Sequence, residues 1–208
     1  MRYYIIKRII DLVLCTLILP FSILIIFIFI IPNIFFLKKN PFFIQKRSGI
    51  HGRAIKIIKI KTMIDDPRLN EFERIYNYGK FLRKYKIDEL PQIFNVFYGT
   101  MSLVGPRPLY IEYNKKYNSF EIQRLKVKPG ITGLAQIKLK NSGNWRSKIK
   151  YDVWYINNKS ISFDIRILIE TVILILKIIF FKKELIEDHK LKSWNIIIQN
   201  GPHTLSVK

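Results

Sequence analysis

The run LVLCTLILPFSILIIFIFIIPNIFFL, residues Leu12–Leu37, decides the architecture of this chain, because its 26 residues carry no charge. As one helix it would be roughly 39 Å long at 1.5 Å per residue, more than the roughly 30 Å hydrocarbon core of a bilayer. A cleaved signal peptide is disfavoured, since the run is too long and no small-residue cleavage motif follows it. We therefore expect residues 1–40 to form an N-terminal membrane-embedded helix.

Basic residues flank this run on both sides. The flanking cations are Arg2, Lys7 and Arg8 before the run, and Lys38, Lys39, Lys46 and Arg47 after it. A spanning helix would place one of these clusters on the disfavoured side of the membrane. Pro20 removes a backbone hydrogen bond and predicts a break in the helix. The pattern favours a re-entrant helix with both ends in the cytoplasm, and a single spanning helix is the open alternative.

Residues 41–184 have the pattern of a small cytosolic domain, so that the whole chain is expected to be α+β and mainly helical. The expected elements are a strand over 54–61, a turn at Asp66-Pro67, a polar helix over 71–86, a helix over 92–98 that begins after Pro91, a glycine loop over 129–133 and a helix over 145–157. Residues 185–208 are expected to form a C-terminal tail without an assigned role.

A second apolar helix is expected over residues 163–181. Its polar residues Arg166, Glu170 and Lys177 fall in a narrow stripe at helical spacing, and the other positions are mostly apolar. A core helix of a soluble domain would show a similar pattern. In a chain that already enters a membrane, an amphipathic helix lying in the membrane interface is the better interpretation.

The charge balance is strongly basic, with 36 Lys and Arg against 15 Asp and Glu and a net charge of +21. Such a charge favours polyanionic partners: nucleic acids, anionic lipid headgroups or nucleotide phosphates. The lysines are spread along the chain and no nucleic-acid-reading motif is present, so we expect no nucleic-acid partner. Cys15 is the only cysteine, which excludes an intramolecular disulfide. A non-catalytic membrane scaffold is the other alternative.

The acidic pair Asp88-Glu89 is the strongest chemical feature of the chain. It lies just before the helix expected after Pro91, where free N–H groups and the helix dipole would keep a carboxylate ionised. Arg107 follows between Pro106 and Pro108. A carboxylate that attacks phosphorus or holds a metal, beside an arginine that forks onto phosphate oxygens, suits phosphate chemistry. Each feature alone also occurs as a helix cap or a surface turn.

The order and spacing of further motifs make the pattern specific. In chain order they are Lys7-Arg8 with Asp11, Gln45 with Arg47 and Gly49, Lys59 to Met63, Arg83, Asp88 to Gln92, Asn95, Gly99, Met101 to Pro108, Tyr113, Val127, Pro129 to Gly133, Ala135-Gln136, Trp145, Asp152 and Tyr155. From about Lys7 to Lys177 the chain thus resembles the bacterial sugar transferases known as small monotopic phosphoglycosyl transferases, which covers nearly their whole catalytic core.

The resemblance implies an enzyme of the cytoplasmic membrane, with its catalytic domain on the cytoplasmic face. Such enzymes transfer a sugar-1-phosphate from a UDP-sugar to undecaprenyl phosphate, release UMP and start the synthesis of a lipid-linked glycan. Asp88 would be the nucleophile that forms an aspartyl-phosphosugar intermediate, and Glu89 would be a second catalytic residue that assists metal binding or the approach of the lipid phosphate. The cofactor would be Mg²⁺, held by Asp88 and Glu89, and membrane lipids would be further partners.

Substrate binding would fall to cations and one amide. The candidates are Arg107, Lys59, Lys61, Arg47, Arg83 and Gln136. Two positions depart from the family pattern: Leu19 precedes Pro20 where the family commonly has serine, and Leu134 precedes Ala135-Gln136 where it commonly has tryptophan. The sequence leaves open the sugar, the glycan pathway and the oligomeric state.

Overall fold

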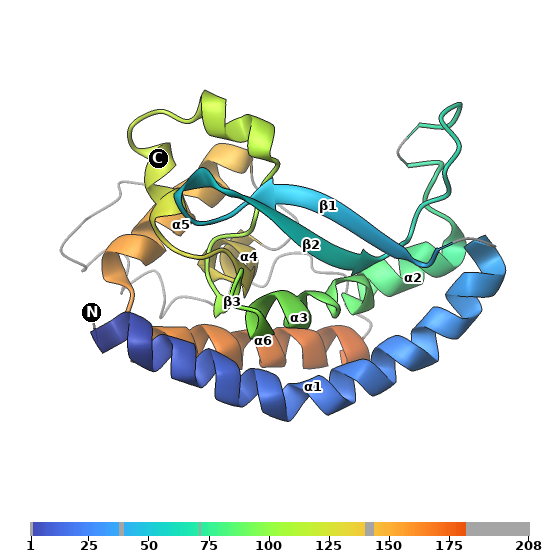
Figure 1. Ribbon diagram of the computed structural model, residues 1–208, viewed down its shortest axis with the longest axis horizontal. Coiled ribbons are helices and arrows are strands. Elements are labelled where there is room, and N and C mark those ends of the chain that lie inside the picture. The colour runs from blue at the N-terminus through green and yellow to red at the C-terminus, as the bar shows by residue number, and fades with distance from the viewer. Residues whose placement is uncertain (1, 38–39, 71, 140–143, 182–208) are drawn as a thin grey trace.

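The longest element is an N-terminal helix, α1 (Arg2–Leu37), in a computed structural model that describes residues 2–37, 40–70, 72–139 and 144–181. Helix α1 contains Pro20 and Pro32 and is assigned as one continuous helix. The predicted break at Pro20 is therefore wrong. Figure 1 shows α1 as an arc whose concave side faces the other elements, and long helices commonly curve in this way around the structure that they cover.

The remaining elements are short. The strands are β1 (Phe42–Ser48), β2 (Ala54–Ile60), β3 (Ser102–Val104) and β4 (Gly130–Thr132); the helices are α2 (Asn77–Lys84), α3 (Gln92–Phe97), α4 (Leu134–Leu139), α5 (Trp145–Asn158) and α6 (Ile161–Phe181). The 3₁₀ segments in the described residues are η1 (Ile50–Gly52), η2 (Ile87–Glu89), η3 (Ile111–Lys116) and η4 (Glu121–Lys126). The described chain is thus α+β and mainly helical, as predicted.

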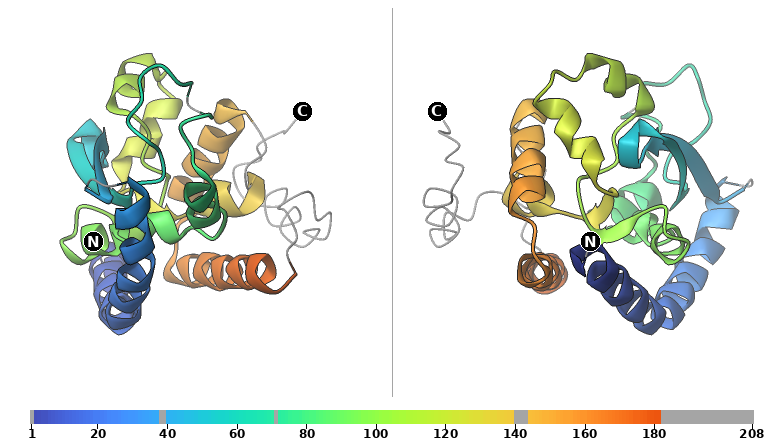
Figure 2. Two further views of the ribbon diagram at one scale, coloured as in Figure 1. Left: turned by 90° about the vertical axis from the view of Figure 1, so that its right-hand side faces the viewer. Right: turned by 60° about the vertical axis from the view of Figure 1, so that its left-hand side comes forward.

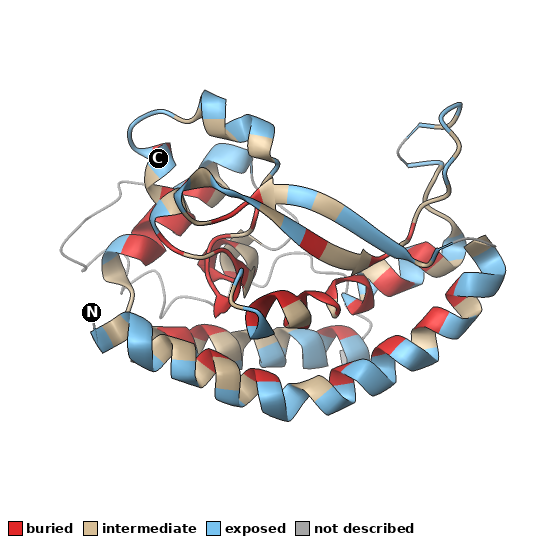
Figure 3. Cartoon of the chain, viewed as in Figure 1, coloured by how far each residue is buried: buried red, intermediate tan, exposed pale blue. Residues whose placement is uncertain are grey.

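Helix α1 buries three polar side chains on its inner face and exposes most of its apolar side chains on its outer face. The buried positions are Asp11, Cys15, Ser22, Ile26, Ile30 and Asn33. On the opposite face Leu17, Phe21 and Phe35 are 62%, 69% and 75% exposed, and Figure 3 shows this exposed face along the convex side of the arc. Within the described residues α1 is the one helix that is long and apolar enough to cross a membrane.

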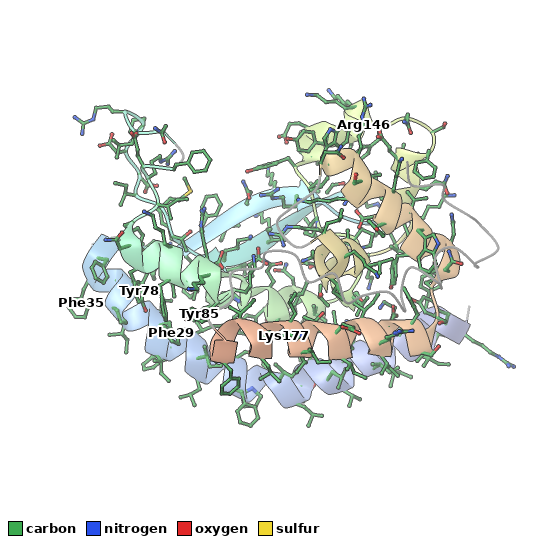
Figure 4. All side chains as sticks on the ribbon, turned by 180° about the vertical axis from the view of Figure 1, so that it is seen from behind. Phe29, Phe35, Tyr78, Tyr85, Arg146 and Lys177 are labelled. Carbon is green, nitrogen blue, oxygen red and sulfur yellow. The ribbon has the colours of Figure 1, made fainter. Side chains whose placement is uncertain are left out.

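Both ends of α1 are fixed to the rest of the chain. Near the first end, the Asp11 carboxylate accepts hydrogen bonds from the Ser102 hydroxyl at 2.7 Å and from the Leu103 N–H at 3.1 Å. Near the other end, Asn33 donates to the carbonyl oxygen of Lys61 at 3.0 Å, and Tyr78 donates to the carbonyl oxygen of Phe29 at 2.9 Å. Figure 4 shows Phe29 and Tyr78 on the same flank of the molecule.

Helix α6 lies on the same side of the molecule as α1 (Figure 2). The carboxylate of Asp164 on α6 accepts hydrogen bonds from the Tyr3 hydroxyl at 2.9 Å, from Lys7 at 2.7 Å and from the Tyr155 hydroxyl at 2.6 Å. One buried carboxylate thus joins α1, α5 and α6. The outer face of α6 is also apolar, since Val172 is 55% and Phe180 is 73% exposed.

Two small sheets lie above this layer. Strands β1 and β2 form an antiparallel hairpin with Phe42 opposite Ile60 and Ser48 opposite Ala54. Strands β3 and β4 are parallel, with Ser102 beside Gly130. The pattern over 54–61 correctly predicted β2, whereas β1 was not predicted and β4 lies in the segment predicted as a loop. A strand as short as β4 is defined by its distant partner rather than by its own residues.

The predicted helix over 71–86 begins later, at Asn77. The Asn70 side chain accepts hydrogen bonds from the N–H groups of Phe72 and Glu73 at 3.0 and 3.1 Å. These bonds stabilise a turn instead of a helix. The predicted helices over 92–98, 145–157 and 163–181 are confirmed with ends that differ by one or two residues.

Candidate active site

The chain presents the acidic pair on a tight turn between α2 and α3. Lys86 adopts a left-handed backbone conformation (φ 59°), and η2 then carries Asp88 and Glu89 into the start of α3. Ile87 on the same turn packs against Ile60 of β2 and Leu82 of α2. The sequence prediction that the pair lies just before a helix is confirmed, and the side chain of Ile87 holds the turn against the scaffold.

Glu89 is occupied by two cations. Its Oε1 accepts a hydrogen bond from Lys59 Nζ at 2.6 Å and another from Arg107 Nη2 at 2.6 Å, and its Oε2 accepts from Arg107 Nη1 at 3.2 Å. Burial by itself would raise the pKa of the Glu89 carboxyl, but the charges of Arg107 and Lys59 hold this pKa well below its usual range. Glu89 is therefore a permanently ionised anchor for both cations.

Asp88 has the opposite environment. Its side chain is buried, and within the described chain its Oδ1 has no hydrogen-bond partner. Burial, reinforced by the neighbouring charge of Glu89, raises the pKa of the Asp88 carboxyl to about 6, while Lys59, Lys86 and Arg83 oppose the rise. At neutral pH the side chain is mostly an ionised carboxylate with a free oxygen, which is the state that a nucleophile or metal ligand requires.

Arg107 is held through its backbone. Its carbonyl oxygen accepts a hydrogen bond from Arg124 Nη2 at 2.7 Å, and Arg124 in turn pairs with Asp152 at 2.8 Å in a buried ion pair. The backbone that precedes Arg107 packs directly against β4. The two chains are so close that a Cβ added at Gly130 would lie 2.1 Å from the backbone nitrogen of Gly105. With its main chain fixed, Arg107 keeps a side chain that is 42% exposed and turned toward Glu89.

Arg47 on β1 lies close to this cluster. Its guanidinium carbon is 3.6 Å from the centre of the Tyr110 ring, and its Nε donates to the side-chain oxygen of Gln45 at 2.9 Å. Burial lowers the pKa of Arg47, and the nearby charge of Arg107 lowers it further, while Glu89 raises it. Arg47 is thus close enough to interact electrostatically with Arg107 and Glu89. A residue that binds the same substrate as Arg107 has to lie this close to it.

The other sequence candidates are less closely joined to the acidic pair. Arg83 donates a hydrogen bond to the Thr62 hydroxyl at 2.7 Å and makes none to the acidic pair among the described contacts. Its positive charge nevertheless lowers the pKa of Asp88. Lys61 pairs with Asp65, and Gln136 donates to the carbonyl oxygen of Ile131 at 2.9 Å. The described contacts therefore bring Lys59 and Arg107 together with the pair, place Arg47 and Arg83 near it, and leave Lys61 and Gln136 outside it.

Sequence reasoning missed Arg124, which supports Arg107. Arg124 belongs to a polar 3₁₀ segment and its partner Asp152 lies 28 residues further along the chain. Asp152 stood among the family motifs, and its burial on α5 in a chain with few acidic residues is the signal that a cation lies opposite it.

The acidic pair suits magnesium in one respect. Proteins hold Mg²⁺ by one or two carboxylates together with substrate phosphates and water. Asp88 offers a free oxygen, whereas both oxygens of Glu89 already accept hydrogen bonds from Lys59 or Arg107. No group of three or more His, Cys, Asp or Glu side chains that could hold a metal occurs in the described part of the chain. A magnesium ion here would need phosphate oxygens of a bound substrate.

A buried carboxylate next to anchored cations, carried on a mainly helical α+β domain with a long apolar N-terminal helix, is an arrangement suited to phosphate chemistry. Residues 2–178 match the family model described as "Bacterial sugar transferase", and the chain belongs to this family. The resemblance stated from the sequence is thereby confirmed.

Several relatives are similar over most of the described chain. The "Uncharacterized sugar transferase EpsL" of Bacillus subtilis is 44% identical over 136 residues, which cover 63% of this chain and 67% of EpsL. The "Galactosyl transferase CpsE" of Streptococcus agalactiae is 39% identical over 171 residues, 73% of this chain and 38% of CpsE. The "UDP-glucose:undecaprenyl-phosphate glucose-1-phosphate transferase" of Klebsiella pneumoniae is 41% identical over 156 residues, 65% of this chain and 32% of that protein.

Proposed function

We propose that this chain transfers a sugar-1-phosphate from a UDP-sugar to undecaprenyl phosphate, and so starts the assembly of a lipid-linked glycan. The names of the Klebsiella relative and of the Salmonella typhimurium "Undecaprenyl-phosphate galactose phosphotransferase", which is 34% identical over 155 residues, support this substrate pair. The observation that carries the proposal is the contrast within the acidic pair: Asp88 keeps a buried, unpartnered oxygen, while Glu89 anchors two cations beside it.

In the first step, the carboxylate of Asp88 attacks the phosphorus that bears the sugar. The new bond joins the carboxylate oxygen to phosphorus, the diphosphate P–O bond breaks, and UMP leaves with the bonding electrons. Lys59 and Arg107, held beside Asp88 by Glu89, stabilise charge on the phosphate oxygens. The product is an acyl phosphate, which is reactive enough to pass on its group.

In the second step, an oxygen of undecaprenyl phosphate attacks the same phosphorus. The bond to Asp88 breaks, the free carboxylate is restored, and the sugar phosphate ends on the lipid as a diphosphate. In both steps Glu89 is a positioning residue, because its two oxygens hold Lys59 and Arg107. Magnesium would be held by Asp88 together with the substrate phosphates, with the negative charge of Glu89 nearby, and would neutralise diphosphate charge and assist the leaving group.

The lipid acceptor requires a site at the membrane surface. We place the exposed apolar faces of α1 and α6 in the bilayer, so that residues 1–40 form the membrane helix and residues 41–184 the catalytic domain, with α6 as its interfacial helix. Both ends of α1 contact the same domain through Asp11 and Asn33. A helix that crossed the bilayer would separate these two contacts, so they support an arrangement with both ends of α1 on one side, and we place that side at the cytoplasmic face because basic residues flank the helix at both ends. The proposed tail, 185–208, lies outside the described residues.

A thiol-labelling experiment tests this topology. In a Cys15→Ser background, single cysteines replace Arg2 and Asn40, both of which are exposed. A membrane-impermeant reagent should label neither site in intact cells and both after the membrane is opened. Labelling of only one site in intact cells would establish a spanning helix, and would leave the proposed chemistry untouched.

The chemistry is tested with purified protein, a panel of UDP-sugars and undecaprenyl phosphate. We expect UMP release with at least one donor, and brief exposure to that donor without lipid should add one sugar phosphate to the peptide that contains Asp88. Mass spectrometry after proteolysis locates the adduct. An adduct on another residue, or UMP release that persists in Asp88→Asn, would refute the double displacement.

A further inference from the structure

Three exposed aromatic side chains lie together on the face that carries Arg47. Tyr110, Tyr113 and Trp145 are 41%, 39% and 44% exposed. Tyr110 precedes η3, Tyr113 belongs to η3, and Trp145 is the first residue of α5. We call these three residues the aromatic shelf. Side chains of this size stabilise a fold most when they are buried, and the shelf leaves much of that area in water.

The rings of the shelf lie against one another and are each partly exposed. The Tyr113 and Trp145 rings are nearly parallel, with centres 6.5 Å apart and planes 19° from each other. The Tyr110 ring meets Tyr113 edge to face at 6.1 Å. The guanidinium of Arg47 covers the Tyr110 ring at 3.6 Å, so a fixed positive charge stands at one end of the shelf.

The scaffold holds the shelf in place. The backbone N–H of Ser48 at the end of β1 donates to the carbonyl oxygen of Leu109 at 2.9 Å, and the Asn114 side chain donates to the carbonyl oxygen of Gly52 at 3.2 Å. The side chain of Asn144 accepts from the N–H of Ser147 at 2.8 Å and caps the helix that Trp145 opens. These bonds leave the shelf preorganised before any ligand arrives.

The shelf begins close to the phosphate-binding cations. Tyr110 lies three residues after Arg107, so their Cα atoms are at most about 11 Å apart even along an extended chain. Arg47 connects the two places, because it stacks on Tyr110 while its pKa responds to the charges of Arg107 and Glu89. A ligand with phosphates on Arg107 would therefore carry its next groups toward the shelf.

We propose that the aromatic shelf binds the base of the nucleotide donor, by stacking a flat ring on Tyr113 and Trp145. The inference rests on the proposed function, and it assigns the base to residues other than those that hold the phosphates. Base–aromatic stacking contributes about 1–3 kcal/mol per base, and an adjacent arginine adds a cation–π term.

The position of the shelf excludes the lipid as its ligand. Figure 4 shows Arg146, the residue after Trp145, at the end of α5 that lies away from α1 and from Lys177 on α6. The apolar faces that would meet the acyl chain are those of α1 and α6, on the opposite side of the molecule. A water-soluble, planar and anionic ligand fits the shelf, which is the description of a nucleotide.

The test is the binding of UMP, which has a base but no transferred sugar. Calorimetry on the full chain in detergent would compare Tyr113→Ala and Trp145→Ala with wild type. We expect UMP to bind roughly 10- to 100-fold more weakly to each variant. The matched control is Tyr98→Ala, because Tyr98 is 77% exposed and lies outside the shelf; its UMP affinity should change less than about twofold. In turnover assays the shelf variants should raise KM for the UDP-sugar far more than they lower kcat.

A crosslinking measurement keeps the test independent of folding in the variants. Light-activated 5-iodo-UMP should attach to the wild-type peptides that contain Tyr113 or Trp145. Unchanged UMP affinity in both alanine variants, or crosslinks confined to other peptides, would overturn the inference. Weaker binding of the UDP-sugar with normal binding of UMP would overturn it too, since the shelf would then hold the sugar. Failure of the proposed function would instead appear as no UMP release from any UDP-sugar, whatever the shelf variants do.

Discussion

Two ionic clusters of this protein use the same residue types in opposite ways. The pair of Arg124 with Asp152 is closed: both side chains are buried, and the guanidinium also donates to the Tyr117 hydroxyl and to the Arg107 carbonyl oxygen. The Glu89 cluster is open. Arg107 is 42% exposed, and the Asp88 oxygen beside it has no partner within the described chain. Polar groups whose hydrogen bonds are all satisfied hold the structure, whereas the unpartnered carboxylate oxygen of Asp88 is left for a ligand.

The two clusters are joined in series. Arg124 fixes the main chain of Arg107, and the Arg107 side chain then reaches Glu89. The closed cluster should therefore affect stability first and catalysis second, and the open one should do the reverse. The variants below test this division, from the largest expected effect to the smallest.

Asp88→Asn should lower turnover by about four orders of magnitude or more, because removal of a covalent nucleophile typically lowers kcat by about this factor. UMP release measures the loss. Stability should not fall with it. Because the folded pKa of about 6 lies above the usual value of 3.8, the folded protein binds the proton more tightly, and the free energy of unfolding falls as pH rises between these values.

The amide of Asp88→Asn removes this penalty, so its melting temperature at pH 7 should equal or exceed that of the wild type. A clear drop in melting temperature would mean that Asp88 is a structural residue. In the wild type, kcat/KM should rise about tenfold per pH unit below pH 6 and level off above it, since only the ionised carboxylate attacks. A profile without this rise would contradict the assignment.

Asp152→Asn should cost roughly 3 kcal/mol of unfolding free energy, because it leaves the buried charge of Arg124 without compensation. Denaturant titration measures the loss. The double variant Arg124→Met with Asp152→Leu should recover most of the stability, since apolar replacements of a buried pair are often neutral. Its activity should stay low, because the Arg107 carbonyl loses its donor. Full recovery of activity would break the proposed connection.

Arg107→Lys should reduce kcat/KM roughly 10- to 100-fold, because a lysine cannot reproduce two parallel hydrogen bonds to Glu89 and to phosphate. Its melting temperature should stay within a few degrees of wild type. Steady-state UMP release and thermal denaturation give the two numbers. Near-normal turnover would show that the flanking prolines, not the guanidinium, matter at this turn.

The smallest effect is expected from Lys61→Met. Lys61 pairs with the exposed Asp65, and such pairs contribute at most about 1 kcal/mol. Its turnover should change less than about twofold, whereas the matched Lys59→Met, two residues earlier and within β2, should lose about tenfold or more. Equal losses of turnover in the two variants would contradict the assignment of Lys59, but not Lys61, to the site.

Local patterns predicted the parts of the fold that are locally determined. The charge-free run, the turn before α3 and the helices α5 and α6 follow from periodicity and from Pro91. The parallel pairing of β3 with β4 could not be predicted, because it depends on contacts between Gly105 and Gly130, 25 residues apart. The late start of α2 depends on one side-chain acceptor, Asn70.

The same limit applies to the site. Asp88, Glu89, Lys59 and Arg107 were identified from the sequence as candidates, and the described structure brings them together. Lys61 was proposed together with Lys59. Residues two positions apart share a face only within a regular strand, and β2 ends at Ile60, before Lys61. Sequence spacing did not predict the ion pair between Lys61 and Asp65, since the residues between them form no helix or strand.

Helix α1 has one further property. Its buried polar residues Asp11, Ser22 and Asn33 recur every eleven positions, which is about three helical turns, so they share one face. An inserted residue between Asp11 and Asn33 would rotate everything beyond it by about 100° and advance it by about 1.5 Å. One of the two contacts would then break. The length of α1 and the direction in which each face points are thus fixed by its contacts with the rest of the protein at Asp11 and Asn33. They do not depend on the thickness of a lipid layer.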